Sequence, residues 1–214
     1  IIGDLAVVHS IDDDVFGIDL TDGSIRWQYA YSAPALTLHG NSSPVPAGDG
    51  VLIGKSGGKL VKLELEQGLP LWETLVTRPS GRTELERITD IDVDPLVVGD
   101  RVYVAAYNGD LAAVDLETGA LLWRRELSSH AGLTADARNL YIADSDDGLW
   151  AAQLDEGAGQ WNQEALRYRD ISAPQRAGDL LLVGDDQGYL HWFSTVDGSH
   201  LGYQRIGKDA IPHR

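Results

Sequence analysis

Residues 94–127, "DPLVVGDRVYVAAYNGDLAAVDLETGALLWRREL", contain four short apolar stretches separated by three turn sequences. The stretches "RVYVAAY" and "LAAVDL" are rich in residues that favour strands. Between them, "NGD" at 108–110 is typical of a hairpin turn that requires positive φ. "GD" at 99–100 and "ETG" at 117–119 supply the other two turns. Four antiparallel strands in about 40 residues are the unit of a β-propeller blade.

The same pattern recurs along the chain as a short apolar strand, an acidic residue, a turn with glycine and, four positions later, usually tryptophan. The copies read "GIDLTDGSIRW", "KLELEQGLPLW", "AVDLETGALLW", "AAQLDEGAGQW" and "WFSTVDGSHLG". Their glycines are 45, 51, 38 and 41 residues apart, at Gly23, Gly68, Gly119, Gly157 and Gly198. Self-similarity at this spacing predicts a repeat architecture.

We therefore predict an all-β fold, a single partial propeller domain over residues 1–214 with about five four-stranded antiparallel blades. The predicted blades cover residues 1–32, 41–77, 92–128, 131–167 and 171–207, and residues 208–214 begin a next blade. The first blade lacks its opening strand, because Gly3-Asp4 aligns with the turn that follows the first strand in later copies. Several second strands are apolar on consecutive residues, so we expect neighbouring blades to bury both of their faces.

The tryptophans occupy one equivalent place on the outer strand, where a large ring can bridge one blade and the next. They are Trp27, Trp72, Trp123 and Trp161. We predict that these rings are structural and form core between blades. In the fifth copy Gly202 takes the place, and Tyr203 beside it is expected to substitute in part.

The composition excludes several classes of function. The chain carries 33 Asp+Glu against 17 Lys+Arg, a formal net charge of −16, which argues against binding to nucleic acid or to an anionic membrane. It has no cysteine, so neither disulfides nor thiolate metal sites are possible. The sequence does not begin with Met, so we expect any signal peptide or lipid-anchor cysteine to lie upstream.

The pattern x-D-x-x-x-G-x-x-x-W, with "SPV" or "DP" opening a blade, resembles the pyrroloquinoline-quinone-type propeller repeat. Over longer segments, above all from Gly81 to Trp123, the chain resembles the propeller lipoproteins of the outer-membrane β-barrel assembly machine. The resemblance implies an eight-bladed, non-enzymatic scaffold, lipid-anchored at the periplasmic face of the outer membrane. It also implies binding to the periplasmic domains of BamA, the barrel-forming subunit, and contact with unfolded outer-membrane proteins.

In the family that the chain resembles, two loops between blades carry the contact with BamA. The first matches Leu36, Leu38 and His39 of this chain, although the family often has arginine in place of His39. Leu36 and Leu38 are two residues apart, so in an extended segment they share one face and can form an apolar contact. The alternative is a connector that packs against its own blades.

The second loop matches Asp90 and Asp92, which alternate along one face with Asp94 and could meet basic side chains of a partner. The alternative is a set of solvated residues at the start of a strand.

We predict no catalytic residue, no metal site and no cofactor. The carboxylates lie at turn positions of the repeat, and the sequence has no G-x-S-x-G or Walker A motif. The histidines at 9, 39, 130, 191, 200 and 213 show no H-x-H or H-E-x-x-H spacing, and we expect His191 to be a packed residue. Two other hypotheses stay open: a fragment of a quinone-dependent dehydrogenase, and a generic propeller scaffold with another partner.

Overall fold

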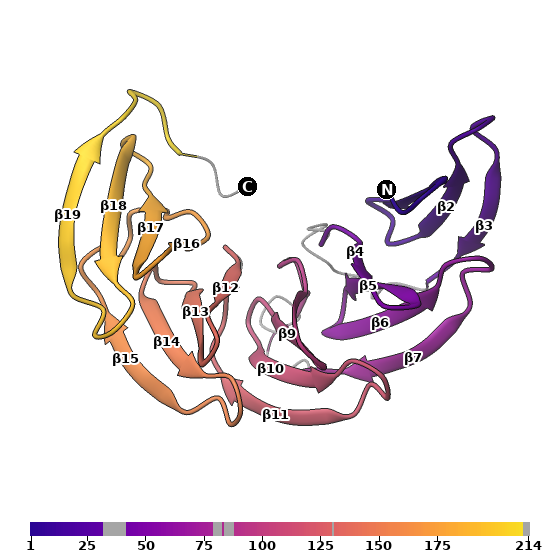
Figure 1. Ribbon diagram of the computed structural model, residues 1–214, viewed down its shortest axis with the longest axis horizontal. Coiled ribbons are helices and arrows are strands. Elements are labelled where there is room, and N and C mark those ends of the chain that lie inside the picture. The colour runs from indigo at the N-terminus through magenta and orange to yellow at the C-terminus, as the bar shows by residue number, and fades with distance from the viewer. Residues whose placement is uncertain (32–41, 79–82, 84–87, 130, 212–214) are drawn as a thin grey trace. The chain divides into compact units, whose positions relative to one another are not determined.

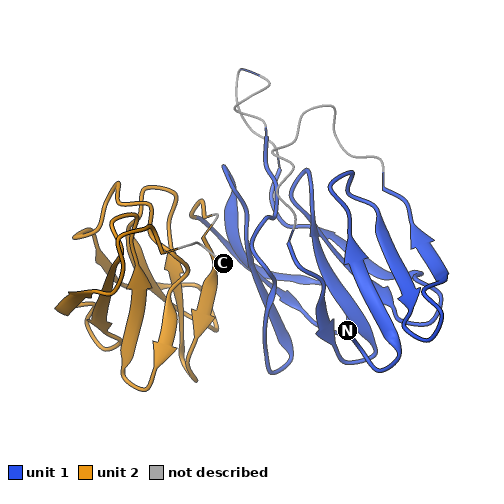
Figure 2. Cartoon of the chain, turned by 90° about the horizontal axis from the view of Figure 1, so that it is seen from above, with its two compact units in different colours: residues 1–126 blue, residues 127–214 orange. Residues whose placement is uncertain are grey.

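The computed structural model describes residues 1–31, 42–78, 83, 88–129 and 131–211. These residues form two compact units, Ile1–Glu126 and Leu127–Arg214, coloured separately in Figure 2. Their regular structure is made of β-strands, and the described residues contain no helix long and apolar enough to span a membrane. Every sheet is an antiparallel meander in which consecutive strands pair, as Figure 1 shows.

The first unit contains one three-stranded and two four-stranded sheets. The first sheet consists of β1 (Leu5–His9), β2 (Val15–Asp19) and β3 (Ile25–Tyr29). The second consists of β4 (Val45–Ala47), β5 (Gly50–Lys55), β6 (Lys59–Glu64) and β7 (Pro70–Leu75). The third consists of β8 (Leu96–Val98), β9 (Arg101–Ala105), β10 (Asp110–Asp115) and β11 (Leu121–Glu126).

The second unit contains two four-stranded sheets. One consists of β12 (Leu133–Ala135), β13 (Asn139–Ala143), β14 (Leu149–Gln153) and β15 (Gly159–Gln163). The other consists of β16 (Gln175–Ala177), β17 (Leu180–Gly184), β18 (Tyr189–Ser194) and β19 (His200–Arg205). The prediction of four-stranded antiparallel sheets is therefore confirmed, with three strands in the first sheet.

The inner strands are buried on both faces, as their continuous apolar sequences predict. All six residues of β5 are buried. Its alternate side chains enter two different cores: Val51 and Ile53 pack with residues of the first sheet, whereas Leu52 packs with residues of the third. Each core is thus a layer between two neighbouring sheets, and burial on both faces explains why most residues of these strands are apolar.

In the first three repeats the acidic residue and the glycine close the turn between the last two strands of a sheet, whereas Gln153 and Ser194 stand at the acidic position in the fourth and fifth. In the third sheet the N–H of Gly119 donates to the carbonyl of Asp115 at 2.9 Å, and the Asp115 carboxylate accepts the N–H of Thr118 at 2.8 Å. The five repeat glycines have φ between 66° and 75°, a region that favours glycine. Turn geometry therefore explains why the position of the glycine relative to the preceding strand is the same in all five copies of the repeat.

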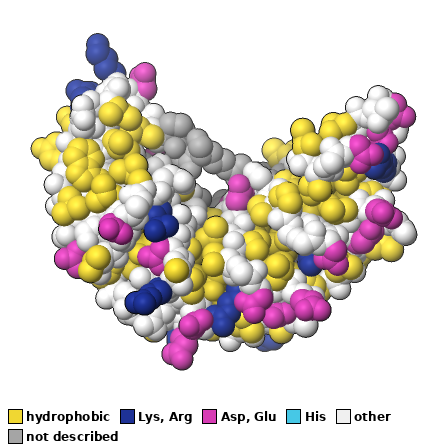
Figure 3. Space-filling model, viewed as in Figure 1, with side chains coloured by type: hydrophobic (Ala, Val, Ile, Leu, Met, Phe, Trp, Pro, Cys, Tyr) yellow, Lys and Arg dark blue, Asp and Glu magenta, His cyan; other side chains and the backbone are white. Residues whose placement is uncertain are grey.

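Exposed hydrophobic side chains occur on the last strand of four of the sheets, where Ile25, Leu71, Leu122 and Leu201 are between 44% and 61% exposed, and also in turns, where Ile11 and Val196 are 65% and 82% exposed. On the face drawn in Figure 3 the hydrophobic side chains are interspersed with acidic and basic ones. Scattered apolar residues of this kind are normal on a protein surface.

Candidate functional site

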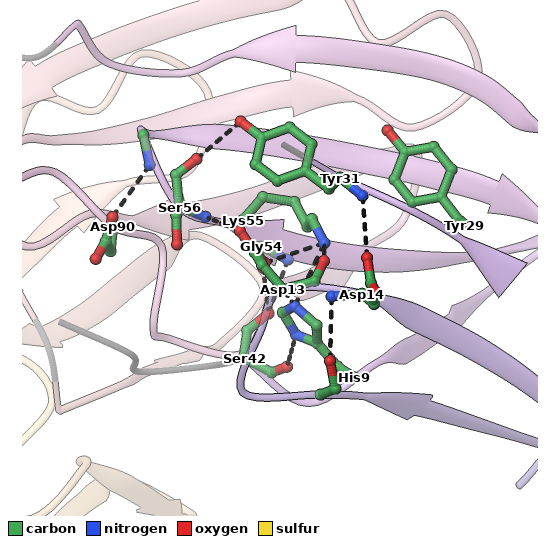
Figure 4. Close-up of polar contacts among 12 residues, drawn as sticks. His9, Asp13, Asp14, Tyr29, Tyr31, Ser42, Gly54, Lys55, Ser56 and Asp90 are labelled. Atoms are coloured by element: carbon green, nitrogen blue, oxygen red, sulfur yellow. Dashed lines mark hydrogen bonds and ion pairs between the residues drawn. The ribbon is translucent and has the colours of Figure 1, made fainter. Parts of the chain in front are cut away.

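The segment that carries the predicted partner-binding residues Leu36, Leu38 and His39 lies outside the described residues, but both of its flanks are described. Tyr31 precedes it and Ser42 follows it. Both flanks contact one polar cluster between the β1–β2 hairpin and the end of β5, which Figure 4 shows.

Asp13 is the centre of the cluster. It lies in the turn between β1 and β2 with a φ of 69°, a conformation that aspartate tolerates better than most residues. Its Oδ1 accepts a hydrogen bond from Nε2 of His9 at 2.7 Å and lies 3.0 Å from Nζ of Lys55. Its Oδ2 accepts the backbone N–H of Ser56 at 3.1 Å. Because the side chains of His9, Asp13 and Lys55 are at most 4% exposed, we call them the buried ionic cluster.

Asp13 and Lys55 of the buried ionic cluster depend on each other for their charge. Burial alone would raise the pKa of Asp13, but the hydrogen bond from His9 and the charge of Lys55 lower that pKa overall. Burial lowers the pKa of Lys55, and Asp13 opposes this change. The Lys55 ammonium also lies 4.9 Å from the centre of the Tyr31 ring, a cation–π distance. A buried charge that loses its partner is strongly destabilising, so the cluster acts as a unit.

The cluster and its neighbours hold the residues on both sides of the 32–41 segment. On one side, the backbone N–H of Tyr31 donates to Asp14 Oδ1 at 3.2 Å and its hydroxyl donates to the Ser56 carbonyl at 3.2 Å. On the other side, Nδ1 of His9 lies 3.0 Å from the Ser42 carbonyl, and Ser42 Oγ accepts the N–H of Gly54 at 2.7 Å. The two ends of the segment are therefore fixed to the same part of β5.

Asp90 is joined to the same region but is buried, with only 1% of its surface exposed. Its Oδ1 accepts the backbone N–H of Gly57 at 3.0 Å, two residues after Lys55, and its backbone forms a bridge with Ser56. Its carbonyl accepts the N–H of Tyr107 at 2.9 Å. The carboxylate thus fixes the backbone that follows β5.

The three aspartates of the second loop differ in exposure. Asp90 is buried, Asp92 is partly exposed and Asp94 is exposed. Asp94 Oδ1 accepts the backbone N–H of Ser43 at 2.5 Å, which links this loop to the residues that follow the 32–41 segment. The structure therefore links the second loop to the residues that follow the 32–41 segment, but it does not present the three carboxylates equally to solvent.

His9, Asp13 and Lys55 are not among the residues predicted from the sequence. His9 and Lys55 are 46 positions apart, and each stands in a strand of a different sheet. The one local signal is a lysine at the end of the fully buried strand "GVLIGK", since a lysine on such a strand requires a partner.

The tryptophans of the repeat contact the next sheet along the chain in three described cases. The indole Nε1–H of Trp27 donates to the Leu65 carbonyl at 2.8 Å, that of Trp72 to Leu116 at 3.1 Å, and that of Trp161 to Thr195 at 3.1 Å. Each acceptor lies three residues before the repeat glycine of the next sheet. A Cβ built on Gly68 would lie 2.4 Å from the Trp27 ring, so glycine is required where the ring packs.

Trp123 contacts Tyr103 within its own sheet, with the two ring centres 5.9 Å apart. In the fifth sheet the expected substitution by Tyr203 is wrong. Trp192 on β18 pairs with Gly202 on β19, and a Cβ on Gly202 would lie 2.8 Å from the Trp192 ring. Tyr203 instead pairs with His191, so its side chain is on the other face of the sheet. The large ring is supplied from the neighbouring strand.

The comparisons with known proteins agree on one family. A family model described as "Outer membrane protein assembly factor BamB" matches residues 1–163. BamB of Yersinia pestis is 36% identical over 202 residues, which are 94% of this chain and 51% of that protein. The chain thus spans about half the length of the curated relatives it matches.

Two solved structures are informative. The crystal structure of BamB from Moraxella catarrhalis is similar with a TM-score of 0.92 and 31% identity, over 98% of this chain and 63% of that one, which confirms the propeller fold class. A europium-containing methanol dehydrogenase shares the fold alone, with a TM-score of 0.74 and 16% identity over 96% of this chain and 50% of that one. With a family model that covers residues 1–163 and this agreement in sequence and structure, the chain belongs to the BamB family of outer membrane protein assembly factors.

Proposed function

We propose that this chain is part of a non-enzymatic scaffold that binds the periplasmic domains of BamA. Through that contact it assists the folding and insertion of β-barrel outer-membrane proteins, and it works at the periplasmic face of the outer membrane, lipid-anchored in the full-length protein. Membership of the BamB family supports this role. The acidic charge of −16 suits a basic protein surface as partner.

The observation that carries the proposal is the buried ionic cluster with its neighbours. It fixes Tyr31 and Ser42, the residues on either side of the segment with Leu36, Leu38 and His39. A binding segment that is fixed at both ends loses less conformational freedom when a partner binds. Buried ionic groups add little to stability by themselves, so their presence here fits a positioning role.

The residues of the two loops receive different roles in this proposal. Leu36 and Leu38 supply the apolar contact with BamA, and Asp92, which is partly exposed, supplies an acidic contact. Asp90 is buried against Gly57 and supports the loop from within. The proposal needs no cofactor and no catalytic residue.

The test is a binding measurement between this chain and the purified periplasmic domains of BamA. We expect Leu36→Ala combined with Leu38→Ala to weaken binding at least about tenfold, as loss of central apolar contacts does. The matched control is Leu69→Ala combined with Leu71→Ala, which removes two exposed leucines with the same spacing from the second sheet. The control pair should change binding less than about twofold.

Asp92→Asn tests the acidic contact separately. Because a charge that partly faces solvent at the rim of an interface acts mainly on the association rate, this variant should slow association at low salt and have a smaller effect at high salt. Equal binding by the wild type and both leucine pairs, with all proteins folded, would contradict the site assignment. Absence of any binding by the wild type would contradict the proposed partner.

A further inference from the structure

The second unit contains a pocket of about 330 Å³ whose chemistry the scaffold role does not use. The segment after β15 supplies Leu166 and Arg169 to its lining, and β18 and β19 supply Tyr189, His191, His200 and Tyr203. Two histidines therefore meet in one pocket, although they are nine positions apart and show no metal-binding spacing in the sequence. His191 is 4% exposed, whereas His200 is exposed, so the pair is accessible from one side.

The ring nitrogens of this pair face each other. Nδ1 of His191 lies 3.3 Å from Nε2 of His200. In a tetrahedral zinc site with Zn–N bonds of about 2.05 Å, two ligand nitrogens lie roughly 3.3 Å apart. The observed separation fits one metal ion bound by both nitrogens, and it equally fits a hydrogen bond between the two rings.

The other nitrogen of His191 has the partner that metal-bound histidines usually have. Its Nε2 lies 3.1 Å from Oδ2 of Asp185, a fully buried carboxylate, so Nε2 donates and Nδ1 keeps its lone pair in the neutral ring. A carboxylate that holds the far side of a ligand histidine fixes both its tautomer and its orientation. Asp185 is itself held by the backbone N–H groups of Gln187 and Tyr189 at 3.0 and 2.9 Å.

Aromatic neighbours hold both rings in place. Phe193 stacks on His200 with ring centres 4.7 Å apart, and Tyr203 lies 5.7 Å from His191 and 6.0 Å from His200. Histidine side chains that are already held in place lose less conformational freedom when they bind a metal ion.

One feature opposes a cation. Arg169 donates to Asp185 Oδ2 from Nε at 2.9 Å and from Nη2 at 2.5 Å, and so offsets the negative charge of that carboxylate. Asp185 therefore orients His191 but adds little net attraction. Affinity has to come from the two imidazoles, because the described residues contain no group of three or more His, Cys, Asp or Glu placed to hold a metal. This favours late transition metals over Ca²⁺ or Mg²⁺, which prefer oxygen ligands.

We propose that Nδ1 of His191 and Nε2 of His200 form a binding site for a divalent late transition-metal ion of the Zn²⁺ type, with water completing its coordination. The site lies in the second unit and is independent of the BamA contact proposed above.

The experiment is calorimetric titration of the untagged, chelator-treated chain with ZnCl₂ at pH 7.5, with CaCl₂ and MgCl₂ for comparison. We expect one Zn²⁺ per chain and no comparable binding of Ca²⁺ or Mg²⁺. His200→Ala, a substitution at an exposed position, should weaken Zn²⁺ binding at least about tenfold, and Asp185→Asn about 10–100-fold. His213→Ala, which removes a histidine elsewhere in the sequence, should leave binding unchanged.

Nuclear magnetic resonance of the histidine ring nitrogens provides a second readout that does not depend on affinity. Zn²⁺ should shift Nδ1 of His191 and Nε2 of His200 and leave the other nitrogen of each ring less affected. The proposal is overturned if wild type and His200→Ala bind Zn²⁺ equally. It is also overturned if the pair only shares a proton, so that its signals move with pH but not with Zn²⁺.

Discussion

Lys55 and Asp13 form an ion pair that is buried on both sides, with Nζ 3.0 Å from Oδ1 and the two side chains 1% and 4% exposed. Lys55 ends β5 of the second sheet, and Asp13 lies in the β1–β2 turn of the first. The pair therefore joins the first two sheets. It lies beside Tyr31 and Ser42, the residues on either side of the segment that connects these sheets.

Lys55→Met should lower the free energy of unfolding by about 3–5 kcal/mol, because it leaves the Asp13 carboxylate buried without its cation. Lys59→Met is the matched control, since Lys59 pairs with Glu73 at 3.6 Å with both side chains 37% exposed. That pair should contribute no more than about 1 kcal/mol. Urea unfolding of both variants measures the difference, and equal costs would show that the buried ionic cluster is not a unit.

Gly68→Ala should destabilise the chain more than Gly23→Ala, although the two glycines hold the same place in the repeat. Both have positive φ, 68° and 75°, so both variants incur about 1–2 kcal/mol of backbone strain. A Cβ on Gly68 would also lie 2.4 Å from the Trp27 ring, whereas no described atom lies within 4 Å of a Cβ on Gly23. The additional cost should be about 1–3 kcal/mol in urea unfolding, and Trp27→Leu should reduce it.

The stability of the second unit should fall at alkaline pH through Tyr141. Burial and the hydrogen bond from its hydroxyl to Asp136, at 2.6 Å, raise the pKa of Tyr141 to about 12, well above the ordinary value of a tyrosine hydroxyl. A raised folded-state pKa means that the contribution is fully present below about pH 10 and is lost as pH rises toward 12, by on the order of 2–3 kcal/mol.

Tyr141→Phe should remove this pH dependence between pH 10 and 12. Tyr168→Phe, at a position that is 77% exposed, should keep it. The measurement is the free energy of unfolding as a function of pH for the wild type and both variants. If the free energy of unfolding of Tyr141→Phe falls between pH 10 and 12 as steeply as that of the wild type, Tyr141 is not the cause of the pH dependence.

Asp90→Ala should lower the free energy of unfolding by about 1–3 kcal/mol, because the partly buried backbone N–H of Gly57 would lose its acceptor, the buried Asp90 carboxylate. Asp100→Ala, at a side chain that is 91% exposed, should change it by less than about 0.5 kcal/mol. Thermal or urea unfolding distinguishes the two. Similar small effects would mean that the Asp90 carboxylate faces solvent in solution.

Much of the fold could be predicted because its determinants are local. The alternation of strand and turn, the acidic residue that accepts hydrogen bonds in the turns of the first three repeats and the glycine with positive φ all act within a few residues. The apolar inner strands, such as β5, indicated burial on both faces. In the fifth sheet, Trp192 of β18 supplies the large ring that the other repeats place at the position of Gly202. This replacement could not be predicted in the same way, because it depends on which residues of β18 and β19 lie opposite each other.

The candidate site, too, could be predicted only in part from the sequence. By itself the sequence determined the repeat, the sheet type and the positions that break the repeat, including the segment with Leu36 and Leu38 and the loop with Asp90 and Asp92. Only the tertiary structure decided that Asp90 is buried, that Lys55 meets Asp13 and that His191 faces His200. The reason is that these contacts depend on strand register and on how neighbouring sheets stack, and such long-range geometry leaves no periodic trace in the sequence.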